Sequence, residues 1–212
     1  MSPAQNTVTI AAPNFETVAF PIVGTAPFVM HKFAAKARLQ MMNKHAAGGA
    51  GRSKNAREPR DFDADYEGAK HVSMDGWTGI AAPAFRNAMI SACRAAGFVM
   101  TRAKLAVFVE PDGFDVDDGT PLVKITKGEP VKHEGYARNE TGVVDIRVRP
   151  MWREGWEAVV RVTFDADMFT VTDVANLLSR AGTQVGVGEG RPDSKKSAGC
   201  GWGTFKLQDG AS

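Results

Sequence analysis

The residues best suited to chemistry lie near the carboxyl end of the chain, where glycines alternate with basic residues. Glycine occurs at seven positions between residues 182 and 203, with three cations among them. Glycine lets a backbone approach a ligand closely, and successive backbone N–H groups can form a concave anion site. The pattern predicts binding of a polyanion, most simply a nucleic-acid strand. The candidate phosphate ligands in this loop are Gly186, Gly188, Arg191, Lys195 and Lys196.

This glycine-rich loop does not have the form of a nucleotide-hydrolysing P-loop. That motif needs Gly-x-x-x-x-Gly-Lys-Ser/Thr between a strand and a following helix. Here the glycines follow an apolar-periodic helix expected at residues 172–181. The alternative interpretation is a long connection whose glycines only permit tight turns. A loop of this length inside a domain is usually functional or disordered.

A second basic region runs from residue 32 to residue 60, where the only acid is Glu58. A helix is expected at residues 32–44 and a glycine-bearing loop at 48–60, with His31 and Phe33 positioned to stack on bases. The acids at 61–67 lack the Gly and Glu of a calcium loop, and we expect an acidic solvated turn there. A solvated surface is the alternative for the bases. They are Lys32, Lys36, Arg38, Lys44, Arg52, Lys54, Arg57 and Arg60.

Two further arginines, Arg147 and Arg149, would share one face if residues 143–148 begin a strand. Ion pairing to Asp145 or Glu157 is the alternative role for the arginines of this region. Trp152 and Trp156 would form either a stacking platform or part of the core, and core packing is more common.

Nothing in the sequence predicts a metal, a cofactor or a disulfide. The four histidines lack His-x-x-x-His spacing, and the two cysteines, Cys93 and Cys200, lie far apart. We expect Cys93 to pack on an apolar helix face and Cys200 to be exposed. The residues show no secretory signal and no membrane-length apolar run, so we expect a cytoplasmic protein that does not contact membranes. The net charge of +2 makes the placement of the bases decisive.

These residues are positioned by alternating helical and strand-like segments. We expect strands at 15–23, 105–109, 122–126, 143–148, 156–164 and 203–207, and helices at 83–96 and 172–181. Pro21 and Pro27 predict that the first strand is an edge strand or ends early. The order predicts an α+β fold of the split β-α-β, RRM or ferredoxin kind. It would be a single domain over 15–207, with a basic insertion at 31–78 and flexible tails at 1–14 and 208–212.

Three segments resemble the RAMP superfamily, which includes the Cas7-type backbone subunits of CRISPR effector complexes. They are Gly24 to His31, Gly79 to Met89 and the stretch from Gly186 to Phe205. The first resembles the family's opening strand, the second the start of its first core helix, and the third its glycine-rich loop and last strand. Arg86 lies in the second segment and is a further candidate ligand.

Across roughly residues 15–207 the chain is also similar to uncharacterised phage-encoded proteins. The shared stretches include Met30 to Phe33, Ala56 to Asp61, Asp145 to Arg147 and Gly186 to Pro192. Gly190 stands where these relatives often carry Trp. The phage likeness slightly favours DNA metabolism in a bacterial host cell.

The resemblance implies a Cas7-like protein that assembles side by side on a strand. With the basic segments, it leads us to expect a non-enzymatic, sequence-independent protein that binds single-stranded DNA or RNA as a homo-oligomer or multi-subunit filament. One alternative is a metal-independent ribonuclease with His31 as the general base, as in some RAMP relatives. Another is an inhibitor or scaffold that mimics a Cas7 subunit and binds host proteins.

Overall fold

The computed structural model describes residues 10–33, 35–46, 60–138, 144–194 and 199–208. They form an α+β structure with antiparallel sheets, which confirms the expected fold class. The elements in chain order are β1 (Phe15–Gly24), β2 (Phe28–Val29), α1 (Ala35–Ala46), α2 (Phe62–Gly68), β3 (Gly79–Ala81), α3 (Ala82–Ala96), α4 (Met100–Ala106), β4 (Val107–Glu110), β5 (Gly113–Phe114), β6 (Pro121–Lys127), β7 (Pro130–Arg138), β8 (Val144–Trp152), β9 (Glu157–Asp165), α5 (Val171–Arg180), a π-helix (Ala181–Val185) and β10 (Phe205–Leu207).

The larger sheet has the order β10-β1-β9-β6-β3, with β4 also paired to β9 and β5 to β6. The first strand is interior only over Ile22–Gly24, which pairs with β10; the rest of the strand pairs with β9 alone among the described residues, so the prediction of an edge strand is wrong for the end of β1 and confirmed before it. Pro21 is tolerated because its carbonyl accepts from Gln208 just beyond β10. The nitrogen of a strand residue points to the same side as its carbonyl, so the missing N–H of Pro21 lies on the β10 side, just beyond the last β1–β10 pair at Ile22.

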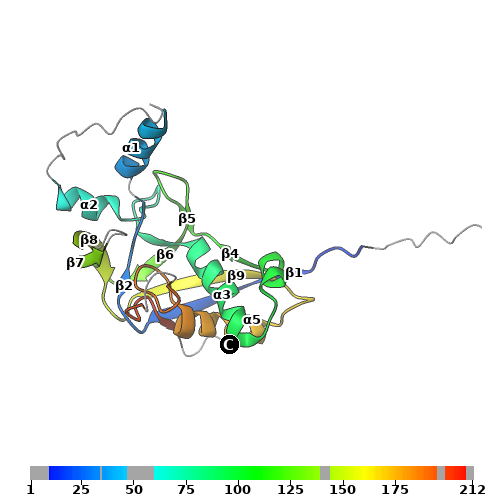
Figure 1. Ribbon diagram of the computed structural model, residues 1–212. Coiled ribbons are helices and arrows are strands. Elements are labelled where there is room, and N and C mark those ends of the chain that lie inside the picture. Colours follow the sequence, from blue (N-terminus) through cyan, green and yellow to red (C-terminus); the bar gives the residue numbers. More distant parts are fainter. Residues whose placement is uncertain (1–9, 34, 47–59, 139–143, 195–198, 209–212) are drawn as a thin grey trace, which may run out of the picture.

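Helices α3 and α5 pack on one face of this sheet (Figure 1). The expected stripe of Phe85, Met89 and Ile90 is buried, and α3 ends at Gly97 with φ +70°. A Thr170–Asp173 capping box starts α5. The chain does not leave the helix at Gly182 as expected, because a π-helix continues to Val185. Gly182 is needed for packing, since a Cβ there would overlap the carbonyl oxygen of Phe205.

A smaller sheet of order β2-β8-β7 stands beside the larger one. Its longest ladder pairs β7 with β8 over nine residues of each strand. The sequence did not indicate β7 or the short helix α4. Trp152 and Trp156 are fully buried, which confirms the core interpretation of both residues.

The insertion leaves the body after β2 and returns before β3 (Figure 1). Its first helix, α1, confirms the expected helix in residues 32–44 with later bounds. The acids at 61–67 form helix α2 instead of a turn, because the Asp61 carboxylate accepts from the N–H groups of Asp63 and Ala64, both at 3.0 Å.

Within the described ranges, no helix has both the length and the apolar character needed to cross a membrane.

Candidate nucleic-acid interface

The two arginines of β8 lie on one face of that strand, as their spacing predicted. Every second residue of β8 from Asp145 onward is half-buried, and Arg147 and Arg149 belong to this set. The residues between them are either exposed or fully buried. Across the ladder, His133 of β7 pairs with Arg149. Directly opposed residues share a face of a sheet, so one imidazole and two guanidiniums belong to the same surface.

The glycine-rich loop brings a single carboxylate to this surface. Glu189 is held in place by backbone pairing to Val29, to whose carbonyl its N–H donates at 2.9 Å. Its side chain lies 3.5 Å from Arg149, 4.0 Å from Arg147 and 3.9 Å from His31. We call His31, Arg147, Arg149 and Glu189 the basic cluster. Its three bases come from two distant segments and surround one acid.

The pairing within the basic cluster is incomplete. Arg149 Nε and Glu189 Oε2 are both buried atoms without a hydrogen-bond partner among the described residues. The side chain of Arg149 is 15% exposed, and burial lowers its pKa, with Glu189 acting in the opposite direction. Buried polar atoms are usually hydrogen-bonded. Glu189 therefore leaves the hydrogen-bonding capacity of this buried guanidinium N–H unsatisfied, although its carboxylate lies only 3.5 Å away.

The electrostatic setting of His31 follows from the same neighbours. Burial, and next the guanidinium of Arg149, lower its pKa below the ordinary value of 6.5, while Glu189 partly opposes them. The imidazole is accordingly neutral near pH 7, with a side chain 44% exposed.

Trp202 and His133 border the basic cluster, and the sequence did not single them out. Their rings meet edge to face with centroids 5.1 Å apart. Trp202 is half-buried and also covers Gly190, where a Cβ would lie 2.6 Å from the indole. The only sequence signal was an aromatic between two glycines.

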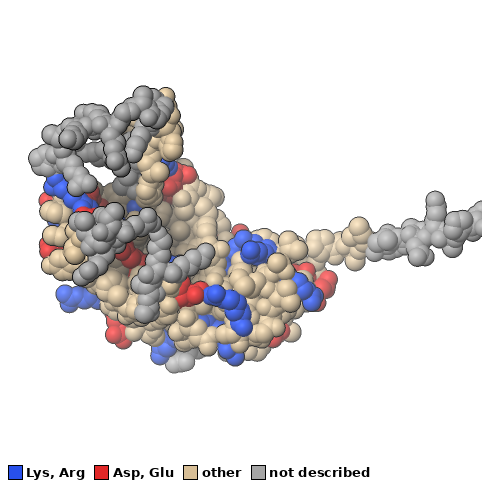
Figure 2. Space-filling model, in the orientation of Figure 1, with Lys and Arg blue, Asp and Glu red and all other residues tan. Residues whose placement is uncertain are grey.

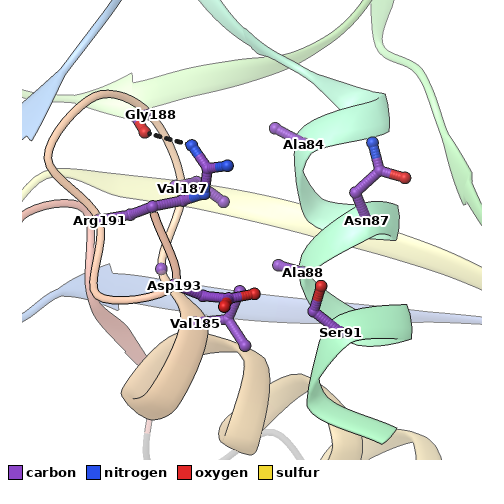
Figure 3. A pocket seen from close by; sticks show the side chains of 10 residues that line it. Ala84, Asn87, Ala88, Ser91, Val185, Val187, Gly188, Arg191 and Asp193 are labelled. Carbon is purple, nitrogen blue, oxygen red and sulfur yellow. Dashed lines mark hydrogen bonds between the residues drawn. The ribbon is translucent and has the colours of Figure 1, made fainter. Parts of the chain in front are cut away.

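The glycines of the loop serve first its own packing. Gly186 and Gly188 have φ values of +72° and +81°, which L side chains rarely adopt. A Cβ on Gly188 would lie 2.5 Å from the carbonyl oxygen of Val29. This favours the alternative that these glycines permit turns and close packing. Arg191 Nη1 donates to the carbonyl of Gly188 at 3.1 Å, and the guanidinium lines a pocket beside α3 (Figure 3).

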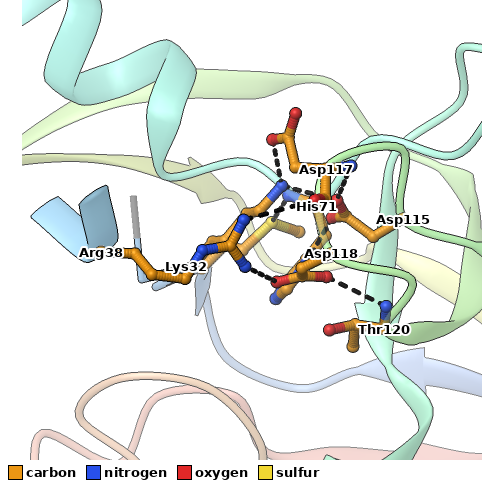
Figure 4. A network of polar contacts seen from close by, with 8 residues as sticks. Lys32, Arg38, His71, Asp115, Asp117, Asp118 and Thr120 are labelled. Carbon is orange, nitrogen blue, oxygen red and sulfur yellow. Dashed lines mark hydrogen bonds and ion pairs between the residues drawn. The ribbon is translucent and has the colours of Figure 1, made fainter. Parts of the chain in front are cut away.

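Lys32 is buried, which argues against the expected phosphate contact. Its ammonium donates to Asp115 and Asp117, each at 2.6 Å, and its side chain is 3% exposed (Figure 4). His71 Nδ1 lies 2.8 Å from the other oxygen of Asp115. Burial alone would lower the pKa of Lys32, but its hydrogen bonds to the two carboxylates outweigh burial and raise it. The sequence could not reveal acids so distant in the chain.

Two other predicted ligands also have structural partners. Arg60 bridges Asp65 of α2 and Asp145 of β8, at 2.6 Å and 2.7 Å. Arg86 donates to the carbonyls of Val107 and Lys104 and so fastens α3 to the junction of α4 and β4. Both side chains are used to hold elements together.

Phe33 and Arg38 lie at the start of the insertion. Phe33 is 54% exposed. Arg38 is 3.4 Å from the carbonyl of Asp117 and 4.0 Å from the Asp118 carboxylate. Lys36 and Lys44 belong to α1, but their side chains lie outside the description. Five further predicted ligands lie outside the described residues: Arg52, Lys54, Arg57, Lys195 and Lys196.

Charges of both signs are interspersed over the face seen in Figure 2. The space-filling view shows no continuous basic stripe across the described atoms, as the net charge of +2 suggests. On this face the described charges therefore do not form a wide positive field.

Within the described ranges, no group of three His, Cys, Asp or Glu side chains is close enough to hold a metal ion. Cys93 is buried and Cys200 exposed, and both are free thiols. The basic cluster can bind and orient an anion through guanidinium donors. Neither family models nor curated protein sequences give a match to this chain.

Proposed function

We propose that this protein binds single-stranded nucleic acid through the phosphate backbone, without sequence readout and without catalysis. One observation carries the proposal: Arg147, Arg149 and His31 converge on the single carboxylate of Glu189, and the buried Nε–H of Arg149 has no hydrogen-bond partner among the described residues. A phosphate can take that donor in place of Glu189. Phosphate contacts of this kind fix a strand without reading its bases.

Half-exposed aromatic rings at the edge of the cluster support a single strand over a duplex. Trp202 and His133 lie beside Arg149, and unpaired bases stack on such rings whatever their identity. A duplex keeps its bases stacked inside, so it would gain only the phosphate contacts. DNA is slightly preferred to RNA on the phage likeness alone.

The proposal extends to the fold, which we infer to be RRM-like and of the RAMP kind. The order β10-β1-β9-β4 supports it, because α3 joins β1 to β4 in the chain and α5 joins β9 to β10. That is the connection pattern of a split β-α-β fold. Assembly of copies along the strand follows from the same resemblance. Among the described residues β7 is the outermost strand of its sheet, and its Tyr136 is 79% exposed, which is compatible with such contacts.

The direct test is a titration of labelled single-stranded and duplex oligonucleotides at two salt concentrations. We expect the single strand to bind more tightly, cooperatively on long strands, with a log–log salt slope of about −0.7 for each phosphate contacted. Anisotropy measures both affinities under matched conditions. The proposal would be overturned if neither oligonucleotide bound, or if the single strand and the duplex bound equally and without salt dependence.

The lowered pKa of His31 predicts that binding strengthens in mild acid. A bound phosphate favours the imidazolium, so binding takes up a proton. Affinity should then rise as pH falls toward the lowered pKa of the free protein and level off below it. A His31→Gln variant should lose this dependence over about pH 5 to 8 while still binding at the upper end. If the variant and the parent show the same pH profile, His31 does not face the strand.

A metal-independent ribonuclease is the second candidate, and the neutral His31 favours it. A general base must be deprotonated at working pH, and the nearby guanidiniums would stabilise a developing phosphorane charge. Incubation of labelled RNA and DNA with the protein in chelator separates the two functions. Cleavage of RNA that disappears in His31→Ala would replace the binding proposal, whereas retention of intact strands agrees with it.

A further inference from the structure

A pocket of about 320 Å³ lies between helix α3 and the glycine-rich loop. Its apolar wall is made of Ala84 and Ala88 on α3, which face Val185 at the end of the π-helix and Val187 on the loop in Figure 3. Alanine at these two helical positions leaves the space open, because residues four apart lie on the same face of a helix. A volume near the lower limit of small-molecule sites suits a ligand of nucleoside size.

Polar groups border the apolar wall. Asn87 and Ser91 line the pocket from α3, and neither side chain has a hydrogen-bond partner among the described residues. Asn87 carries both a donor and an acceptor, which its amide can exchange by rotation. Asp193 is fixed by Arg94 at 2.6 Å and contributes a carboxylate. A flat apolar ring with hydrogen-bonding edges matches these walls.

One cationic side chain, Arg191, lines the same pocket. Arg191 uses one N–H on the carbonyl of Gly188, which leaves further donors of its guanidinium for a phosphate. Ala84, in the first turn of α3, also lines the pocket, and that turn has no acidic residue and no side-chain cap. The pocket therefore joins an apolar slot to a polar margin on which, among the described residues, the one anionic side chain, Asp193, is already paired with Arg94 and Arg191 keeps free donors.

The loop places this pocket next to the basic cluster. Gly188 lines the pocket, and the next residue, Glu189, meets Arg147 and Arg149. We propose that the pocket takes one unstacked nucleobase of the bound strand, whose backbone crosses the loop between Arg191 and the basic cluster. The inference rests on the proposed function and adds that the strand is held by a base as well as by phosphates.

The test uses the full chain and a single-stranded oligonucleotide that carries 2-aminopurine, whose emission rises when the base unstacks. Ala84→Leu fills the pocket without changing charge, and Asn87→Ala removes an exposed edge group with little risk to folding. Ala95→Leu, on an exposed position of the same helix, is the matched control. Anisotropy of the same oligonucleotide measures affinity.

We expect emission to rise on binding to the parent and to Ala95→Leu. Ala84→Leu should abolish the rise in emission, because the leucine side chain occupies the space of the base. It should also weaken affinity about tenfold, the effect of losing one buried contact between the base and the protein. Asn87→Ala should reduce both. If the parent binds the strand with unchanged emission, and Ala84→Leu matches Ala95→Leu in affinity, the pocket inference is overturned while phosphate binding stands.

Adenosine 5′-monophosphate separates failure of the pocket from failure of the proposed function. Chemical-shift changes confined to Ala84, Ala88 and Arg191, lost in Ala84→Leu, would support the pocket even if no oligonucleotide bound. That result would overturn strand binding alone. Absence of binding by both the mononucleotide and the oligonucleotide would overturn both proposals.

Discussion

Replacing Arg147 and Arg149 together by alanine should weaken single-strand binding about 100-fold, because each guanidinium offers a phosphate charged hydrogen bonds of about 1.5–3 kcal/mol. Arg149 has the larger share, since its Nε is buried and, although 3.5 Å from the Glu189 carboxylate, has no hydrogen-bond partner among the described residues. The log–log salt slope should fall by about 1.4 for the two lost phosphate contacts. Anisotropy titrations at several salt concentrations give both quantities, and the loss should be the same for all sequences.

Two further variants make this result specific to the basic cluster. Arg102→Ala with Lys104→Ala removes the same charge from exposed positions on α4 and should change affinity little. Glu189→Gln should act in the opposite direction and tighten binding, because the carboxylate competes with phosphate for both arginines. If the α4 variant weakens binding as much as the β8 variant, only net charge matters. If Glu189→Gln weakens binding, the phosphate does not replace that carboxylate.

Local patterns predicted the parts of this structure that local rules decide. The strict alternation of β9, the glycine stop of α3 and the threonine cap of α5 all depend on neighbours within a few residues. The shared face of Arg147 and Arg149 followed from the same period of two. The acids at 61–67 have the charge of a solvated turn, but they form a helix because Asp61 is a favourable N-cap residue.

Partners distant in the chain could not be found in this way. Lys32 looks in sequence like the other bases of its segment, yet its acids come from the turn after β5. Glu189 is one acid in a basic, glycine-rich loop, and its role appears only when that loop pairs with Val29. His133 lies on β7, whose glycine and charged residues give a weak strand signal. In each case tertiary pairing decides what the side chain does.

The buried contacts among Lys32, His71 and Asp115 also attach the insertion to the body. Lys32 donates its backbone N–H to the carbonyl of Ala69, and the N–H of His71 contacts the sulfur of Met30, so the two ends of the insertion run side by side. Asp115 is fully buried between Lys32 and His71. Burial alone would raise the pKa of Asp115, but the hydrogen bond from Lys32 and others outweigh it and lower the pKa.

Replacing Lys32 by methionine should therefore cost about 3–5 kcal/mol of the free energy of unfolding, because it leaves the Asp115 carboxylate buried without its cation. Urea denaturation measures this loss, and Lys104→Met, at an exposed position, should stay within about 0.5 kcal/mol of the parent. Adding Asp115→Leu to Lys32→Met should restore much of the stability, since an apolar pair removes the uncompensated charge.

The lowered pKa of Asp115 means that its contribution to the free energy of unfolding is present above its ordinary pKa of 3.8 and is lost as pH falls through the lower value. The parent should lose stability in that acid range more steeply than the double variant. Equal stability of Lys32→Met and the parent would show that the ion pairs contribute nothing to folding.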